Sequence, residues 1–190
     1  MSSTTPNPSP PKNLPALSRH ITTHAPNGTA IFSTAIPATL PVTPIPDGAD
    51  FSLAYTTSTI PASFKNDADI PAYAEFIKPG NSPGLVVKSG SVCRIVDMRP
   101  GAISPMHRTV SLDYGVVLEG VVELVLDSGE TRVMNRGDVA VQRGTMHAWR
   151  NTSDTEWARM LYVLLPAEGV NAGGRELGEE LDGMGVPDSK

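Results

Sequence analysis

At 190 residues, with 39% hydrophobic and 18% charged residues, the chain has the size and composition of one globular domain. A net charge of −5 argues against nucleic acid or an anionic membrane as a partner, because both select clustered lysine and arginine. No run of eighteen apolar residues is present, and residues 1–13 lack the apolar stretch of a secretory signal, so we expect neither a membrane span nor secretion. Cys93 is the single cysteine, which excludes a disulfide within the chain and is compatible with the cytoplasm.

The N-terminal third is rich in proline and poor in charge. Residues 1–20 are predicted to be a flexible arm, because Ser, Thr, Pro and Asn cannot bury enough apolar area to offset the entropy of ordering. Residues 21–80 are expected to form strands and loops that cover the main domain or a dimer interface. Within them the composition predicts strands at Ala30–Ile36 and Phe51–Ile60, and a short helix at Asp67–Ile77 with Asp69 as its cap.

From Ser91 onward, short β-prone stretches alternate with turn signals. Strands of this length at near-regular spacing, without helical periodicity between them, indicate an all-β antiparallel sandwich or barrel over residues 81–166. Residues 167–190 then form a Gly- and Glu-rich tail. The predicted strands are Ser91–Arg99, Tyr114–Leu118, Val121–Leu126, Thr131–Met134, Asp138–Gln142 and Trp157–Leu165, and the tail has at most a short helix around Arg175–Leu181.

Two sequence motifs in this region resemble those of the cupin superfamily. The stretch from Gly101 to Asp113, GAISPMHRTVSLD, followed by Gly120, resembles the first motif, which runs from a glycine through His-x-His and Glu to a second glycine. The stretch from Gly137 to Asn151, GDVAVQRGTMHAWRN, resembles the second. The resemblance implies a single-domain cupin double-stranded β-barrel, or jelly roll. It extends to small fungal and bacterial cupins, some of which are associated with polyketide tailoring.

The resemblance also implies a metal site, with two His and one Glu from the first motif and one His from the second. Carried over by position, its ligands are His107, Asp113 in place of Glu, and His147, while Thr109 replaces the other histidine. Two imidazoles and one carboxylate form the ligand set of a facial triad, and Fe, Mn or Zn would be the divalent metal. Threonine is a poor ligand for such a metal, so the sequence leaves open whether a metal cofactor is bound.

Three functional hypotheses fit these residues. The favoured one is an enzyme of secondary metabolism that transfers protons as a lyase or isomerase, acting on a small, partly apolar, aromatic or polyketide-like metabolite. In it, His107 and His147 face each other across the pocket, and Asp113 fixes an imidazole tautomer or shares the base role. The alternatives are a metal-dependent oxidoreductase or dioxygenase and a non-catalytic small-molecule-binding barrel. The predicted substrate-binding residues are Thr109, Trp149 and Tyr114.

A homodimer is the expected assembly. The uncharged, β-prone segment 21–60 provides strand edges, which proteins tend to cover, and two-fold pairing is the commonest way to cover them.

Overall fold

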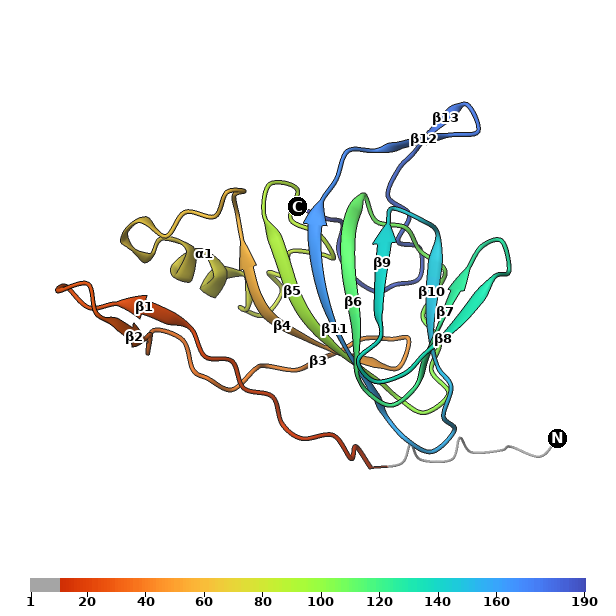
Figure 1. Ribbon diagram of the computed structural model, residues 1–190, viewed down its shortest axis with the longest axis horizontal. Helices are drawn as coiled ribbons and strands as arrows, with labels where there is room; N and C mark the ends of the chain where they lie inside the picture. The colour runs from red at the N-terminus through yellow and green to blue at the C-terminus, as the bar shows by residue number, and fades with distance from the viewer. Residues whose placement is uncertain (1–10) are drawn as a thin grey trace.

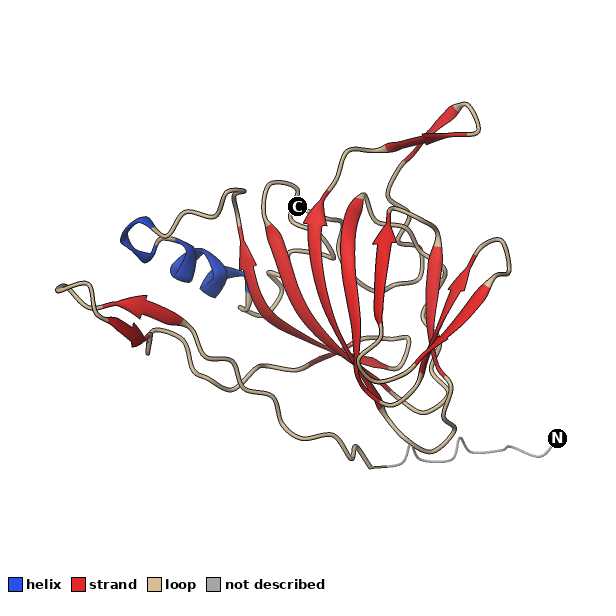
Figure 2. Cartoon of the chain, in the orientation of Figure 1, coloured by secondary structure: helices blue, strands red, loops and turns tan. Residues whose placement is uncertain are grey.

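Two antiparallel sheets dominate the computed structural model, which describes residues 11–190 (Figures 1 and 2). The larger sheet has six strands in the order β3-β4-β5-β11-β6-β9, and the smaller has three in the order β10-β7-β8. This arrangement confirms the all-β class that the sequence predicts. The larger sheet comprises β3 Thr43–Pro44, β4 Ala49–Thr57, β5 Ser91–Met98, β11 Ala158–Pro166, β6 Ser111–Glu119 and β9 Val139–Arg143. The smaller comprises β10 His147–Asn151, β7 Val122–Leu126 and β8 Thr131–Met134.

Smaller elements lie outside the two sheets. A hairpin of β1 Thr22–His24 and β2 Ala30–Phe32 lies at the same end of the molecule as α1 Asp69–Phe76, which contacts β4 (Figure 1). A short 3-10 helix at Lys65–Asp67 precedes α1. A second hairpin, β12 Val170–Ala172 and β13 Arg175–Leu177, projects at the opposite end. No helix in the described part of the chain is long and apolar enough to cross a membrane.

Three local predictions are corrected by the structure. The strand predicted at Ala30–Ile36 stops at Phe32, because β2 pairs with β1 over three residues only. The helix predicted around Arg175–Leu181 is wrong: β13 occupies its start and pairs with β12, since Gly173 and Gly174 adopt the positive φ of a hairpin turn. Asp69 begins α1 but does not cap it, and its carboxylate instead accepts a 2.6 Å hydrogen bond from the Tyr55 hydroxyl.

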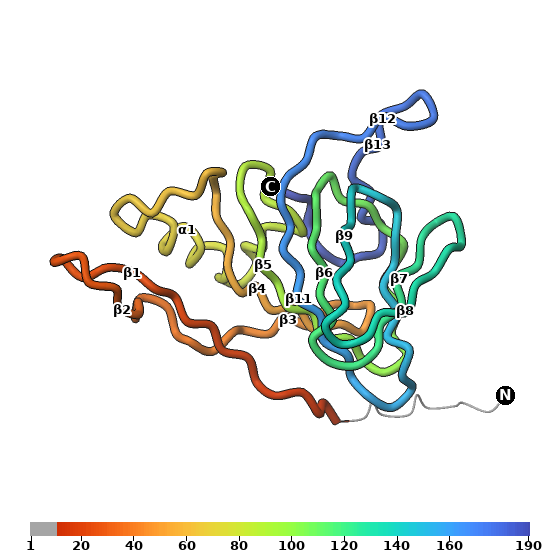
Figure 3. The backbone as a smooth tube through the Cα atoms, in the orientation of Figure 1, coloured from red at the N-terminus to blue at the C-terminus, as the bar shows by residue number. Residues whose placement is uncertain are grey.

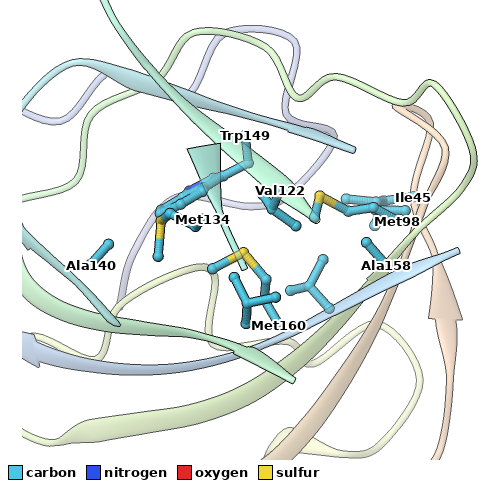
Figure 4. Packing of buried hydrophobic residues seen from close by; sticks show 11 residues of the cluster. Ile45, Met98, Val122, Met134, Ala140, Trp149, Ala158 and Met160 are labelled. Carbon is cyan, nitrogen blue, oxygen red and sulfur yellow. The ribbon is translucent and has the colours of Figure 1, made fainter. Parts of the chain in front are cut away.

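The hydrophobic core fills the space between the two sheets (Figure 4). Val96, Val117 and Met160 enter it from the larger sheet, and Val122 and Trp149 enter it from the smaller one. Every second residue of a strand enters this core, because successive side chains of a strand point to opposite faces of the sheet. Some members of this cluster also line the pocket described below, so the core forms part of its wall.

Segments before and after the barrel pack onto it. The Lys12 ammonium lies 2.8 Å from the Asp50 carboxylate and 2.7 Å from that of Asp97, and β4 pairs with β5 along its length. The C-terminal segment returns from β13 to the chain before β5, where the Val86 amide donates to the Ser189 hydroxyl (Figure 3). Residues 1–10 of the predicted arm lie outside the described residues, and the proposed division of the chain into four parts stays a prediction.

Candidate active site

A pocket opens between the two sheets. The empty space between its walls, counted together with its open mouth, is about 650 Å³. Most of its lining is apolar, so a ligand inside would be shielded from water. The polar groups are His107, Thr109, Asp113, His147, Arg94, Asp47 and Ser104, and the principal apolar ones are Phe51, Leu85, Val96, Met98, Trp149, Tyr162, Leu164 and Met184.

The two histidines are neighbours on one wall of this pocket. His147 begins β10, and the main chain of His107 pairs with it in an isolated antiparallel bridge. Residues directly opposite in an antiparallel pair place their side chains on the same face, and the two ring centroids lie 4.3 Å apart. The prediction that His107 and His147 face each other across the pocket is therefore corrected: they lie side by side.

Main-chain carbonyls fix the hydrogen position on both imidazoles. The Nδ1 atoms of His107 and His147 lie 2.9 Å from the carbonyl oxygens of Pro105 and Thr145, respectively. A carbonyl oxygen only accepts hydrogen bonds, so each Nδ1 carries the hydrogen and each Nε2 keeps its lone pair. This arrangement corrects the suggestion that Asp113 sets the imidazole tautomer.

Burial keeps both rings uncharged at neutral pH. Burial, together with a smaller effect of charge repulsion from the neighbouring His107, lowers the pKa of His147 to about 3. Burial also lowers the pKa of His107, although the Pro105 carbonyl and the Asp47 carboxylate partly offset the effect. Two neutral imidazoles with free Nε2 lone pairs are proton acceptors, and of the two His107 is the stronger base.

Asp113 comes from the other sheet, at an inward-facing position of β6. The Thr109 hydroxyl donates to its Oδ2 at 3.4 Å, and the Ser111 hydroxyl donates to Thr109 at 2.7 Å. Its Oδ1 is buried without a hydrogen-bond partner among the described residues. Burial raises the pKa of Asp113 to about 6, against the opposing effects of Ser111, Thr109 and Arg94. The carboxyl group can therefore hold or release a proton near neutral pH.

The three predicted metal ligands do not gather at one point. Within residues 11–190, no group of three or more His, Cys, Asp or Glu side chains is placed to hold a metal ion. His107 and His147 share one wall, whereas Asp113 belongs to the larger sheet and turns to Thr109. The prediction that these three side chains converge is thus corrected, and the residues present do not fit a three-ligand metal centre.

The predicted substrate-binding residues divide into two groups. Thr109 and Trp149 line the pocket, and the Trp149 ring packs edge-on against His147, with centroids 5.6 Å apart. Tyr114 does not line it: its side chain is 41% exposed, on the outer face of β6. The correction follows from strand alternation, because Asp113 next to it points inward.

Arg94 and Tyr162 are pocket residues that the two motifs do not predict. Both side chains lie on the inner side of the larger sheet, Arg94 from β5 and Tyr162 from the adjacent β11. The guanidinium of Arg94 lies 4.8 Å from the centroid of the Phe51 ring, and its Nη2 donates to the Gly84 carbonyl. The sequence offers Arg94 only as one of several possible residues at the pocket edge, and the alternation of buried Val92, Arg94 and Val96 along β5 is the signal that singles it out.

The fold is thus an antiparallel β-barrel of two sheets, with an apolar pocket between them and two buried histidines on the pocket wall. The family profile of the cupin domain matches residues 94–164. The chain is 50% identical to "Phomopsin biosynthesis cluster protein D" of Diaporthe leptostromiformis, over 90% of this chain and 89% of that protein. It is 47% identical to "Oryzines biosynthesis cluster protein J" of Aspergillus oryzae, over 90% of this chain and 95% of that protein. It is 43% identical to "Cupin-domain-containing oxidoreductase fogC" of Aspergillus ruber, over 84% of this chain and 77% of that protein. The chain belongs to the cupin family.

Proposed function

We propose that this cupin is an enzyme of secondary metabolism that catalyses a lyase or isomerase reaction by proton transfer on a small, partly apolar metabolite. One observation supports this most directly: two neutral imidazoles on one wall of the pocket are matched by a carboxyl group with a pKa of about 6 on the other sheet. A neutral base and a carboxyl group that can hold a proton near neutral pH are what general acid–base catalysis requires. The cluster names of its relatives support the metabolic setting.

The reaction begins with a carbonyl compound between the two walls. The Nε2 of His107 removes a proton from the carbon next to the carbonyl group, and the electron pair moves to the carbonyl oxygen as an enolate. Asp113, in its protonated form, then gives its proton to a departing hydroxyl, which leaves as water, or to a carbon atom of the enolate. The first outcome is a dehydration and the second an isomerisation. Proton exchange with solvent restores His107 and Asp113.

The apolar walls support an aromatic or polyketide-like substrate. The Trp149 and Tyr162 rings lie edge to face with centroids 5.5 Å apart, and Phe51 lies beside Arg94. Such rings bind flat, apolar molecules through offset or edge-to-face contacts.

Metal-dependent oxidation is the second candidate function, because several relatives carry the name cupin-domain-containing oxidoreductase. The pocket residues do not fit the three-ligand centre that this chemistry would need. Oxygen dependence separates the two candidates, since proton transfer consumes no dioxygen.

The test uses deuterium exchange in D₂O, followed by NMR, on small carbonyl compounds with an aromatic or polyketide-like body. Protein dialysed against a chelator and assayed without dioxygen should incorporate deuterium next to the carbonyl group. The His107→Ala variant should lose this exchange, while Arg150→Gln, on the outer face of β10, serves as control. Turnover that needs dioxygen would support oxidation instead. If the compounds bind but show neither deuterium exchange nor turnover, the protein is a non-catalytic small-molecule-binding barrel.

A further inference from the structure

We propose that Arg94 anchors a carboxylate, so that the ligand of this pocket is an organic acid with an apolar body. The identification of that ligand as the substrate rests on the proposed function, whereas the anion site itself stands on the geometry of Arg94.

The guanidinium of Arg94 has a free donor at the pocket. The residue is 4% exposed and lines the pocket, and its Nη1 is buried without a hydrogen-bond partner among the described residues. Its Nη2 is held by the Gly84 carbonyl, and the Phe51 ring lies against its planar face. Nη1 is thus held in place by its neighbours while its own hydrogen bonds remain unmade. Leaving a buried donor unsatisfied is unfavourable, and a ligand oxygen removes that cost.

A second buried arginine of the same sheet shows how the fold satisfies such a group when no ligand is needed. Arg159 donates through Nε and Nη2 to the two carboxylate oxygens of Asp97, at 2.5 and 2.8 Å. No ion pair of this kind joins Arg94 to an acidic residue in the described part of the chain. Asp113 acts on Arg94 through space, without a hydrogen bond between them. A buried cation without a paired anion is unfavourable, and an anionic ligand supplies the missing charge.

The surroundings favour a carboxylate over a phosphate. One guanidinium balances the single charge of a carboxylate, and its fork geometry matches a planar group. A doubly charged phosphate would leave excess negative charge near Asp113, in a pocket whose other walls are largely apolar. The free Oδ1 of Asp113 adds a second requirement, because it can accept a hydrogen bond from a hydroxyl group of the same ligand. A carboxylic acid that also carries a hydroxyl group can bind Arg94 through its carboxylate and Asp113 through its hydroxyl group.

Calorimetric titration of the purified protein with three acid/amide pairs tests the anchor without any turnover: acetate and acetamide, benzoate and benzamide, phenylacetate and phenylacetamide. We expect at least one acid to bind tenfold or more tightly than its amide at pH 7.5. Arg94→Gln should remove this preference and leave amide binding unchanged. Arg94→Lys, which keeps the charge but loses the fork, should retain part of it. Arg150→Gln removes an equal charge outside the pocket and should bind like the wild type.

The proposal is overturned if no acid binds more tightly than its amide, or if Arg94→Gln keeps the preference while its circular dichroism shows a folded protein. Should Arg94→Gln fail to fold, Arg94→Lys decides, because undiminished acid preference in that variant would show that the fork makes no contact. The anchor and the proposed reaction fail separately. Acid binding that depends on Arg94, combined with full activity of His107→Ala, would keep the anion site and reject the proton-transfer function.

Discussion

His107 and His147 form one reciprocal main-chain pair, in which the amide of each donates to the carbonyl of the other at 2.9 Å. This pairing sets the 4.3 Å separation of the two ring centroids and explains why the charge of one opposes protonation of the other. We therefore expect the two imidazoles to act as a unit in which no more than one ring at a time becomes a charged imidazolium.

Alanine substitution of either histidine should reduce turnover. His107→Ala removes the base, and His147→Ala removes the ring that neighbours it, so each should lower kcat/KM by roughly 10²–10⁴. Because the residues act together, the double variant should lose little more than the worse single variant. Steady-state kinetics on the exchanged carbonyl substrate measures this, with circular dichroism to verify folding. Full activity in both single variants would contradict the acid–base mechanism.

The pH dependence of kcat/KM should reveal the protonated form of Asp113. With its pKa raised to about 6, this acid loses its proton above pH 6, so kcat/KM should fall about tenfold per pH unit there. On the acid side, kcat/KM should fall only below pH 6.5, because burial lowers the pKa of His107. Arg94, Tyr162, Thr109 and Ser111 are the groups that influence Asp113.

Asp113→Asn is the matched variant for this profile. It should be slower and should lack the decline above pH 6. If kcat/KM of the wild type rises between pH 6 and pH 7, Asp113 acts as a base and not as an acid.

Protein stability should also depend on His147. Its folded pKa of about 3 lies below the unfolded value of 6.5, so below pH 6.5 the unfolded chain binds a proton that the folded chain does not. Stability from this group is therefore present above pH 6.5 and is lost as the pH falls toward 3. Asp113 acts in the opposite sense between pH 3.8 and about 6, because its folded pKa is raised.

Comparison with His147→Phe isolates the histidine contribution, since both forms keep Asp113. Between pH 7.5 and pH 5, the wild type should lose on the order of 2 kcal/mol of unfolding free energy relative to the variant. Urea denaturation at the two pH values measures the difference. Equal losses in the two proteins would show that His147 protonates freely in the folded state.

The motifs predicted the pocket better than they predicted its chemistry. Motif spacing placed His107 and His147 together, because main-chain pairing follows from the barrel topology. The hydrogen positions on these rings depend on the carbonyl directions at Pro105 and Thr145, which no residue pattern records. Tyr114 was predicted to bind substrate without knowledge of which face of its strand points inward, and the twofold period of a strand places it on the face opposite to that of Asp113. Arg94 lies before the first motif and reaches the pocket only through the pairing of β5 with β11.

The expected homodimer can be tested at the hairpin of β1 and β2. Phe32 is 69% exposed and Ile31 is 44% exposed there, and exposed apolar side chains of this size favour a protein interface. Light scattering at micromolar concentration should give twice the chain mass of 20.1 kDa. Phe32→Asp should shift the protein toward the monomer, whereas Val133→Asp, at a site on β8 that is 58% exposed, should not. A wild-type monomer would contradict the dimer.

Thr109 should determine whether the pocket holds a metal ion. The side chain is 2% exposed, lines the pocket and reaches Asp113, and the resemblance to cupins places a metal-binding histidine at this position. Both existing histidines keep a free Nε2 on the pocket wall, so the double variant Thr109→His/Asp113→Glu should complete a site of three imidazoles and one longer carboxylate. Elemental analysis after incubation with Mn²⁺ or Zn²⁺ and gel filtration should then find about one ion per chain, and the ion should raise the melting temperature of the variant. The wild type, treated in the same way, should contain much less than one ion per chain and should keep its melting temperature. The variant Thr109→Val, which fills the same space without a ligand atom, controls for packing. Equal metal content in the wild type and the double variant would show that His107, His147 and Asp113 already suffice, and would return metal-dependent oxidation to first place.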